Sequence, residues 1–272
     1  VALRHAVDGV HPGAVVGVAF EPGEYYLTLA TWADRPAGPL SDYTGQDAYY
    51  LSIRARASDQ LSMYDYLWRW DTDWFWCSAA FGLQRPVIRR LWPRRWRRSD
   101  VYHRLVGLDQ RLRLTDRLDA IARRPRMERI IQDVEVPVDR LAEFLAWFDD
   151  AVGMRPVWLC PLRLRASARG AAASGSRRPW PTYPLERDTT YVNAGFWGGV
   201  RVGPAADQSP LNRAIERQVH ALGGHKSLYS EAFYDPDTFD RLYGGPNLRA
   251  VKARYDPDNR LTSLYDKSVR RR

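Results

Sequence analysis

The amino-acid sequence predicts an α+β fold, with a mostly antiparallel sheet and helices packed on one face. Runs rich in β-branched and aromatic residues recur along the chain, between turns and segments of helical periodicity. The order of these segments has no fixed repeat, and no glycine-rich dinucleotide-binding turn accompanies them. Together these observations indicate a sheet covered by helices on one side.

The N-terminal part predicts a hairpin followed by an aromatic-rich segment. Residues 14–20 and 25–31 are strand-like and flank a Glu-Pro-Gly-Glu turn, which indicates an antiparallel hairpin. Residues 61–76 predict a short buried helix that runs into an aromatic-rich loop. In 85–98, arginines alternate with tryptophans around Pro93, which breaks a helix, so we expect two short helical pieces or a loop.

Two helices have the clearest signals in the second half of the chain. Residues 138–153 form an amphipathic helix closed by Gly153, whose apolar stripe consists of Leu141, Phe144, Leu145, Phe148 and Val152. The other helix has Ser209 as its N-cap, Pro210 at its first position and Gly223 just past its end. The remaining segments predict a helix in 102–122, strands in 129–137, 155–166 and 189–199, and a surface loop in 167–178.

Length, charge and cysteine use narrow the functional classes. The 272 residues suffice for one large domain or two small ones, and no run approaches the roughly 20 apolar residues of a spanning helix. The first residue is Val1 rather than Met and the opening lacks signal-peptide features, so we expect a fragment or a processed chain without a signal peptide. Cys77 and Cys160 lie far apart and have no Cys or His neighbour at metal-ligand spacing, so the sequence predicts neither a zinc site nor a disulfide framework, and we expect a reducing compartment. The net charge of +9 favours an anionic partner.

The sequence lacks the short motifs that are typical of enzymes. It contains no Gly-x-Gly-x-x-Gly, no phosphate-binding loop, no Gly-x-Ser-x-Gly and no paired histidines at metal spacing. No catalytic residue can therefore be named from motifs. His225 is the histidine of most interest, because it lies at the start of the segment that carries a family resemblance.

Residues 223–267 contain an ordered set of features. Leu228 and Tyr229 are expected on a strand, a first and a second helix follow, and an Asp-Pro turn begins at Asp256; the helices carry Phe239, Tyr243, Val251 and Arg254. This set resembles the C-terminal signature of vanillyl-alcohol-oxidase-type flavoenzymes. Further stretches are similar to Δ24-sterol reductases in the same order, namely 132–137, 155–162, 191–198 and 263–267.

The resemblance implies the cap, or substrate, domain of an FAD-linked oxidoreductase over residues 1–272. It places the body of the FAD-binding domain before Val1, assigns 1–60 to the end of that domain and its connection, and places 223–267 close to the flavin. The implied reaction is hydride transfer between FAD and an apolar sterol-like or isoprenoid substrate, with NADPH as reductant in the reductase direction. An alcohol or sugar oxidase or dehydrogenase is the alternative within flavoenzymes, and this stretch alone is expected to be inactive.

The resemblance also suggests site residues. Tyr229 and Ser230 occupy the place of a flavin-proximal stretch, with Ser230 where many relatives carry lysine; the alternative is that both only pack the strand. Asn193, polar within an apolar strand, needs a partner, either a flavin or substrate oxygen or, as we favour, a neighbouring backbone group. The residues expected either to line a substrate pocket or to form core are Trp74, Trp76, Trp158 and Cys160.

The expected partners follow from the same interpretation. They are an N-terminal FAD-binding domain of the same protein, a lipid-like substrate, and a membrane surface contacted through 85–98, where a plain solvated basic face is the alternative. The expected location is the cytoplasm or the cytoplasmic face of a membrane. A non-catalytic basic module that binds nucleic acid or membrane is the rival class, and nucleic acid is not favoured, because the arginines are scattered and no nucleic-acid motif accompanies them.

Overall fold

The computed structural model describes residues 13–44, 48–73, 78, 82–83, 85–112, 117, 119, 121–164, 183–203 and 208–270. The chain divides into two compact units. The sheet unit comprises Val1–Leu29, Ile130–Phe196 and Asp207–Arg272, and the helical unit comprises Ala30–Arg129 and Trp197–Ala206. Within the described residues, no helix has both the length and the hydropathy needed to cross a membrane.

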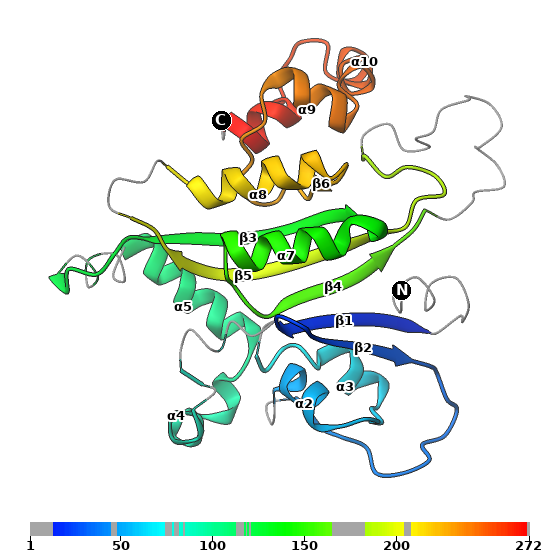
Figure 1. Cartoon of the computed structure of the whole chain (residues 1–272), viewed down its shortest axis with the longest axis vertical. Coiled ribbons are helices and arrows are strands. Elements are labelled where there is room, and N and C mark those ends of the chain that lie inside the picture. The colour runs from blue at the N-terminus through cyan, green and yellow to red at the C-terminus, as the bar shows by residue number, and fades with distance from the viewer. Residues whose placement is uncertain are drawn as a thin grey trace. The chain divides into compact units, whose positions relative to one another are not determined.

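Six strands form one antiparallel sheet in the order β2-β1-β4-β5-β3-β6 (Figure 1). Their bounds are β1 (Ala14–Glu21), β2 (Glu24–Ala30), β3 (Met127–Pro137), β4 (Val157–Leu162), β5 (Tyr191–Arg201) and β6 (His225–Lys226). The predicted hairpin is confirmed as β1 and β2, and Gly23 in its turn has a φ of 83°, which suits glycine. The predicted antiparallel sheet is likewise confirmed.

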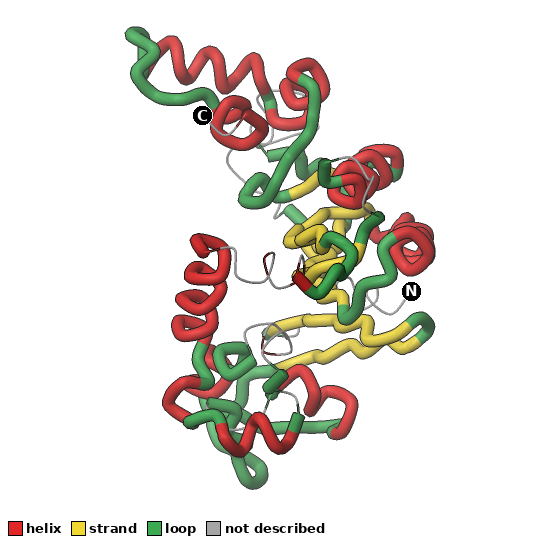
Figure 2. Tube along the Cα trace, turned by 90° about the vertical axis from the view of Figure 1, so that its left-hand side faces the viewer, coloured by secondary structure: helices red, strands yellow, loops and turns green. Residues whose placement is uncertain are grey.

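Two helices cover one face of this sheet, α7 (Leu141–Ala151) and α8 (Pro210–Ala221), and Figure 2 shows both on the same side of the strands. A single 3-10 turn, η3 (Val138–Arg140), precedes α7. The Phe148 ring of α7 lies 4.6 Å from the Phe196 ring of β5, centroid to centroid. This confirms the predicted α+β architecture with helices on one face of the sheet.

The start of α8 differs in one detail from the prediction. Ser209 does occupy the N-cap position and Pro210 begins the helix, but the Ser209 side chain makes no capping hydrogen bond. The Ser209 backbone has a φ of 53°, and its hydroxyl hydrogen-bonds instead to a carboxylate oxygen of Glu231 at 3.2 Å. The helix boundary was therefore predicted correctly and the capping contact was not.

The C-terminal segment folds as α9 (Pro236–Tyr243), α10 (Gly245–Tyr255) and a final π-helical turn, η4 (Asp266–Arg270). The two predicted helices are confirmed. The predicted strand through Leu228 and Tyr229 is wrong, because β6 pairs only with Val134 and Glu135 of β3 before the chain turns. Tyr229 lies in that turn and is 57% exposed.

The helical unit contains α2 (Tyr49–Ala55), α3 (Met63–Trp68), α4 (Pro86–Leu91), η2 (Arg94–Trp96) and α5 (Ser99–Leu112). The two short helical pieces expected on either side of Pro93 are confirmed as α4 and η2. The helix expected after residue 60 is present as α3, but it is not buried. Its core role is taken by tyrosines that precede it, since Tyr43, Tyr49 and Tyr50 are all buried.

Candidate functional site

The face of the sheet opposite α7 and α8 carries a polar cluster. Alternate residues of β3 point to opposite faces, so Val134 and Val136 are buried on one side while Asp133 and Glu135 lie on the other. Directly paired residues share a face, which places His225 beside Glu135. We call this group the Glu135 cluster; its members are Asp133, Glu135, Tyr183, Asn193, His225 and Ser227.

Glu135 lies at the centre of the cluster and is 1% exposed. Its Oε1 accepts three hydrogen bonds of 3.0 Å, from the hydroxyls of Tyr183 and Ser227 and from Nδ2 of Asn193. Its Oε2 lies 3.6 Å from Nε2 of His225. One carboxylate oxygen is therefore held by three donors, while the other faces an imidazole.

This environment shifts the proton affinity of Glu135. Burial raises its pKa to about 7, although the hydrogen bonds from Tyr183, Ser227 and Asn193 act in the opposite direction and the Asp133 charge adds to the rise. Burial also raises the pKa of the Tyr183 hydroxyl, and the neighbouring Glu135 carboxylate contributes. Glu135 can therefore hold or release a proton close to neutral pH.

His225 is fixed by aromatic rings and by a close backbone approach. The rings of Tyr183 and Tyr191 meet its imidazole edge-on at 5.4 and 5.3 Å between centroids. The preceding Gly224 has no side chain, and a Cβ there would come within 2.4 Å of the Glu135 carbonyl oxygen. Glycine at 224 thus lets His225 approach Glu135.

Asp133 extends the cluster along the same face of β3. Burial raises the pKa of its carboxyl, and a hydrogen bond from Tyr229 opposes this rise. The Cys160 thiol is also near, since burial, followed by the Asp133 charge, raises the pKa of Cys160. Two acids and a thiol therefore share this face with His225.

The structure brings four of the predicted site residues to this face. Asn193 pairs with Cys160, and Trp158 pairs with Gly195, so all three side chains point the same way, and Tyr229 joins them through Asp133. Asn193 binds the Glu135 side chain rather than the backbone partner we favoured. Trp158 and Cys160 are half-buried; the fully buried positions of β4 are Val157 and Leu159, on the helix-covered face.

The other predicted residues are less connected. Ser230 is half-buried, and among the described residues its hydroxyl has no hydrogen-bond partner. Trp74 and Trp76 lie outside the described residues. The cofactor- and substrate-binding roles assigned to all these residues remain predictions.

Sequence reasoning missed Asp133 and Glu135. The available signal was the alternation in 130–137, where two acids two positions apart share a face. Ile131 shares the face of the acids and is 41% exposed, whereas Ile130 is buried on the other face with Val134 and Val136.

A buried ion pair lies on the opposite, helix-covered side of β6. Nζ of Lys226 lies 3.6 Å from a carboxylate oxygen of Glu216 on α8, and the Lys226 side chain is fully buried. Lys226 also donates to the Glu231 carbonyl, and both Glu216 oxygens accept from the Phe233 N–H. This lysine is therefore occupied in joining the C-terminal segment to α8.

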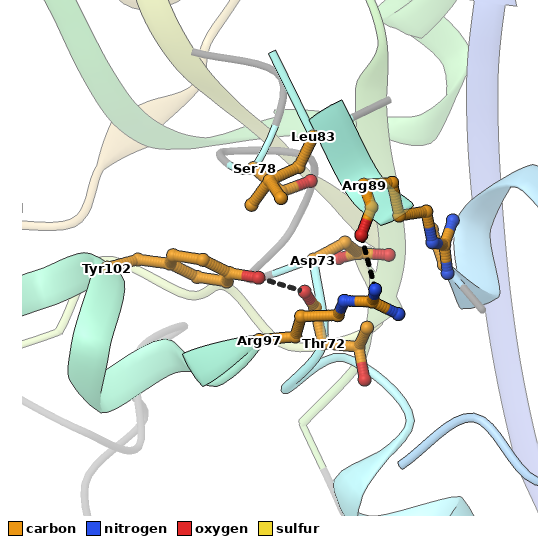
Figure 3. Close-up of a pocket in the computed structure, with 8 residues that line it drawn as sticks. Thr72, Asp73, Ser78, Leu83, Arg89, Arg97 and Tyr102 are labelled. Atoms are coloured by element: carbon orange, nitrogen blue, oxygen red, sulfur yellow. Dashed lines mark hydrogen bonds between the residues drawn. The ribbon is translucent and has the colours of Figure 1, made fainter. Parts of the chain in front are cut away.

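The helical unit has a polar core of its own, shown in Figure 3. The Tyr102 hydroxyl donates to the Thr72 carbonyl at 2.7 Å, and Arg97 donates to the Arg89 carbonyl. The cavity beside them is about 10 Å³, which holds one water molecule at most. With Asp73 and Tyr102 both buried, this arrangement stabilises the unit and offers no room for a substrate.

The described residues contain no group of three or more histidine, cysteine or acidic side chains placed to hold a metal ion. In the Glu135 cluster, hydroxyl, amide and imidazole groups surround the buried carboxyl groups. Fold and site together define the class of protein: an α+β domain in which one face of the sheet carries buried polar and titratable side chains.

Comparison with known proteins gives this domain a family context. No family model matches the chain. The chain is similar to Delta(24)-sterol reductases, with 24% identity to that of Rattus norvegicus and 23% to that of Homo sapiens, each over 139 residues. Identity to that of Arabidopsis thaliana is 26% over 153 residues. These matches confirm the resemblance to Δ24-sterol reductases.

The matches cover part of each protein. They include 51% of this chain for the two mammalian enzymes and 53% for the plant enzyme. The matched part spans only about a quarter of the length of these relatives, 25% and 27% respectively.

Proposed function

We propose that this chain supplies the substrate-side domain of an FAD-dependent oxidoreductase that transfers hydride between flavin and an apolar, sterol-like or isoprenoid substrate. The observation that carries the proposal is the similarity to Delta(24)-sterol reductases over half of the chain. In this proposal the partner is an FAD-binding domain of the same protein, NADPH is the reductant, and the present stretch is inactive alone. The proposed location is the cytoplasm or the cytoplasmic face of a membrane.

The Glu135 cluster fits a polar group bound against the sheet. Among the described residues, three buried oxygens of the cluster accept no hydrogen bond, namely Oδ1 of Asp133, Oε2 of Glu135 and Oδ1 of Asn193. Buried acceptors normally have a donor, so a ligand with N–H or O–H groups would complete them. Asn193, Tyr229 and Ser230 are the residues we propose for contact with the flavin, which supplies hydride exchange when bound.

Saturating a carbon–carbon double bond adds one hydride and one proton. We propose that Glu135 holds that proton, because its pKa of about 7 leaves the carboxyl partly protonated at neutral pH. The three donors on Oε1 fix the carboxyl group and leave Oε2 to exchange the proton. Trp158 and Cys160, half-buried on the same face of the sheet, would line the apolar substrate and exclude water.

One observation favours a second candidate, an FAD-dependent alcohol or sugar oxidase or dehydrogenase. Two carboxyl groups and an amide converge on one face of the sheet, at Asp133, Glu135 and Asn193. Such groups suit the hydroxyls of a polar substrate, whereas a wall of tryptophans suits a lipid. Under this alternative Glu135 would accept a hydroxyl proton instead of donating one.

A substrate panel distinguishes the two candidates. The full-length protein, supplied with FAD, is expected to saturate the side-chain double bond of a sterol when NADPH is present, measured by mass spectrometry of the product. Glu135→Gln should slow this turnover by roughly 100- to 10,000-fold, and the exposed Glu143→Gln should not. Anaerobic bleaching of the flavin by an alcohol or sugar would instead favour the second candidate, and inactivity toward every substrate would contradict both.

A further inference from the structure

An exposed surface of the helical unit combines arginines with aromatic and apolar side chains. We call it the basic–aromatic patch; it consists of Tyr64, Leu67, Trp68, Arg94, Arg95 and Arg98. Five of these residues line a cavity of about 350 Å³, which Thr44 and Asp71 complete. The cavity is large enough for a phosphate with its attached group, unlike the single-water cavity beside Tyr102.

The charge of the patch is suited to an anion. Within the described part of the chain, Arg94 and Arg95 form no ion pair, and Arg98 pairs only with Asp100, where both side chains are largely exposed. The acid in the cavity wall, Asp71, already accepts hydrogen bonds from the backbone and hydroxyl of Ser99. Three guanidinium groups therefore lie beside two carboxylates, Asp71 and Asp100, and the remaining positive charge favours phosphate binding.

The apolar side chains indicate which source of phosphate the patch fits. Tyr64, Leu67 and Trp68 lie at i, i+3 and i+4 on α3 and are 61%, 64% and 49% exposed. The next helix along the chain, α4, exposes Val87 and Leu91 at 71% and 79%. Binding of a soluble phosphate compound requires no such exposed apolar surface. At a bilayer surface, in contrast, apolar and aromatic side chains insert next to the lipid phosphate groups.

We infer that the basic–aromatic patch is a docking site for the phosphate groups of an anionic phospholipid bilayer. The arginines contact lipid phosphates, and the α3 side chains enter the interface between head groups and acyl chains. This inference stands independently of the proposed reaction. It extends the membrane contact expected through 85–98 to α3, which the sequence predicted to be buried.

The test is vesicle binding by the full-length protein, measured by co-sedimentation. Vesicles with equal parts of phosphatidylcholine and phosphatidylglycerol are expected to bind, and pure phosphatidylcholine much more weakly. Arg94→Gln, Arg95→Gln and Arg98→Gln together should weaken binding roughly 100-fold, at about 5-fold for each arginine. If the triple variant does not fold, the single variant Arg95→Gln is used in its place, and it should weaken vesicle binding about 5-fold.

The matched control removes the same charge from exposed arginines of the sheet unit, with Arg217→Gln, Arg254→Gln and Arg260→Gln. For the apolar part, Trp68→Ser should weaken binding roughly 10-fold, and Tyr255→Ser, at a residue that is 72% exposed, should not. Equal losses in both triple variants would attribute binding to net charge and overturn the proposal. Binding of soluble pyrophosphate without binding of vesicles would also overturn the proposal. A full-length protein that does not bind vesicles, because its other parts cover the patch, would overturn it as well.

Discussion

Glu135→Gln is expected to change the pH dependence of stability by about 3 kcal/mol between about pH 4.5 and pH 8. The Glu135 pKa rises from 4.5, its ordinary value, to about 7 in the fold. The folded state therefore binds the proton more tightly than the unfolded state does. The stability contributed by the protonated carboxyl is full below the unfolded pKa of about 4.5 and is lost as the pH rises through about 7.

The measurement is urea unfolding followed by circular dichroism, on wild type and variant, at about pH 5 and about pH 8. The amide that replaces the carboxyl keeps an oxygen for the three donors and cannot ionise, so the variant should gain stability relative to wild type at the higher pH. Glu143→Gln removes a carboxylate from an exposed position of α7 and is the control. A difference between wild type and Glu135→Gln that stays constant with pH would contradict the buried, proton-holding state of Glu135.

Lys226→Met is expected to lower the free energy of unfolding by about 3–5 kcal/mol. The side chain of Lys226 is fully buried and that of its partner Glu216 is 7% exposed, so removal of the ammonium leaves a carboxylate enclosed without its cation. Burial already raises the pKa of Glu216, and the loss of Lys226 removes a charge that opposes this rise. The measurement is again equilibrium unfolding in urea.

A second substitution, at Glu216, distinguishes the effect of a lost ion pair from the effect of lost packing. Lys226→Met combined with Glu216→Gln should recover at least half of the loss, because the amide oxygen still accepts from the Phe233 N–H and no buried charge remains. The exposed Lys267→Met removes the same charge and should change stability by less than about 0.5 kcal/mol. A loss under about 1 kcal/mol for Lys226→Met would show that the pair is solvated.

The fold was predictable where one residue pattern dominates. The stripe from Leu141 to Phe148 specifies α7, since only a helix gathers those side chains on one face. The exposed α3 was not predictable, because its aromatic residues resemble those of a core helix and only the packing of Tyr43 and Tyr50 shows that the core is already filled. The short β6 was also missed, since strand length depends on a partner that composition does not reveal.

The candidate site was predictable in part. Asn193 stood out as a polar residue in an apolar strand, and its need for a partner was correct. The partner, Glu135, is 58 residues away in the chain and meets Asn193 only through strand order. Tyr183 and Ser227 reach Glu135 from loops, where neither spacing nor periodicity gives a signal. Convergence of this kind becomes visible only once the sheet is assembled.

The most direct test of the central proposal is the visible absorption spectrum of the protein purified with the coding sequence upstream of Val1 included. The proposal predicts flavin bands in the longer product and none in the 272-residue chain. Release of FAD on denaturation would identify the cofactor. A longer product that folds and carries no flavin, even after incubation with FAD, would contradict the flavoenzyme assignment and favour a non-catalytic basic module.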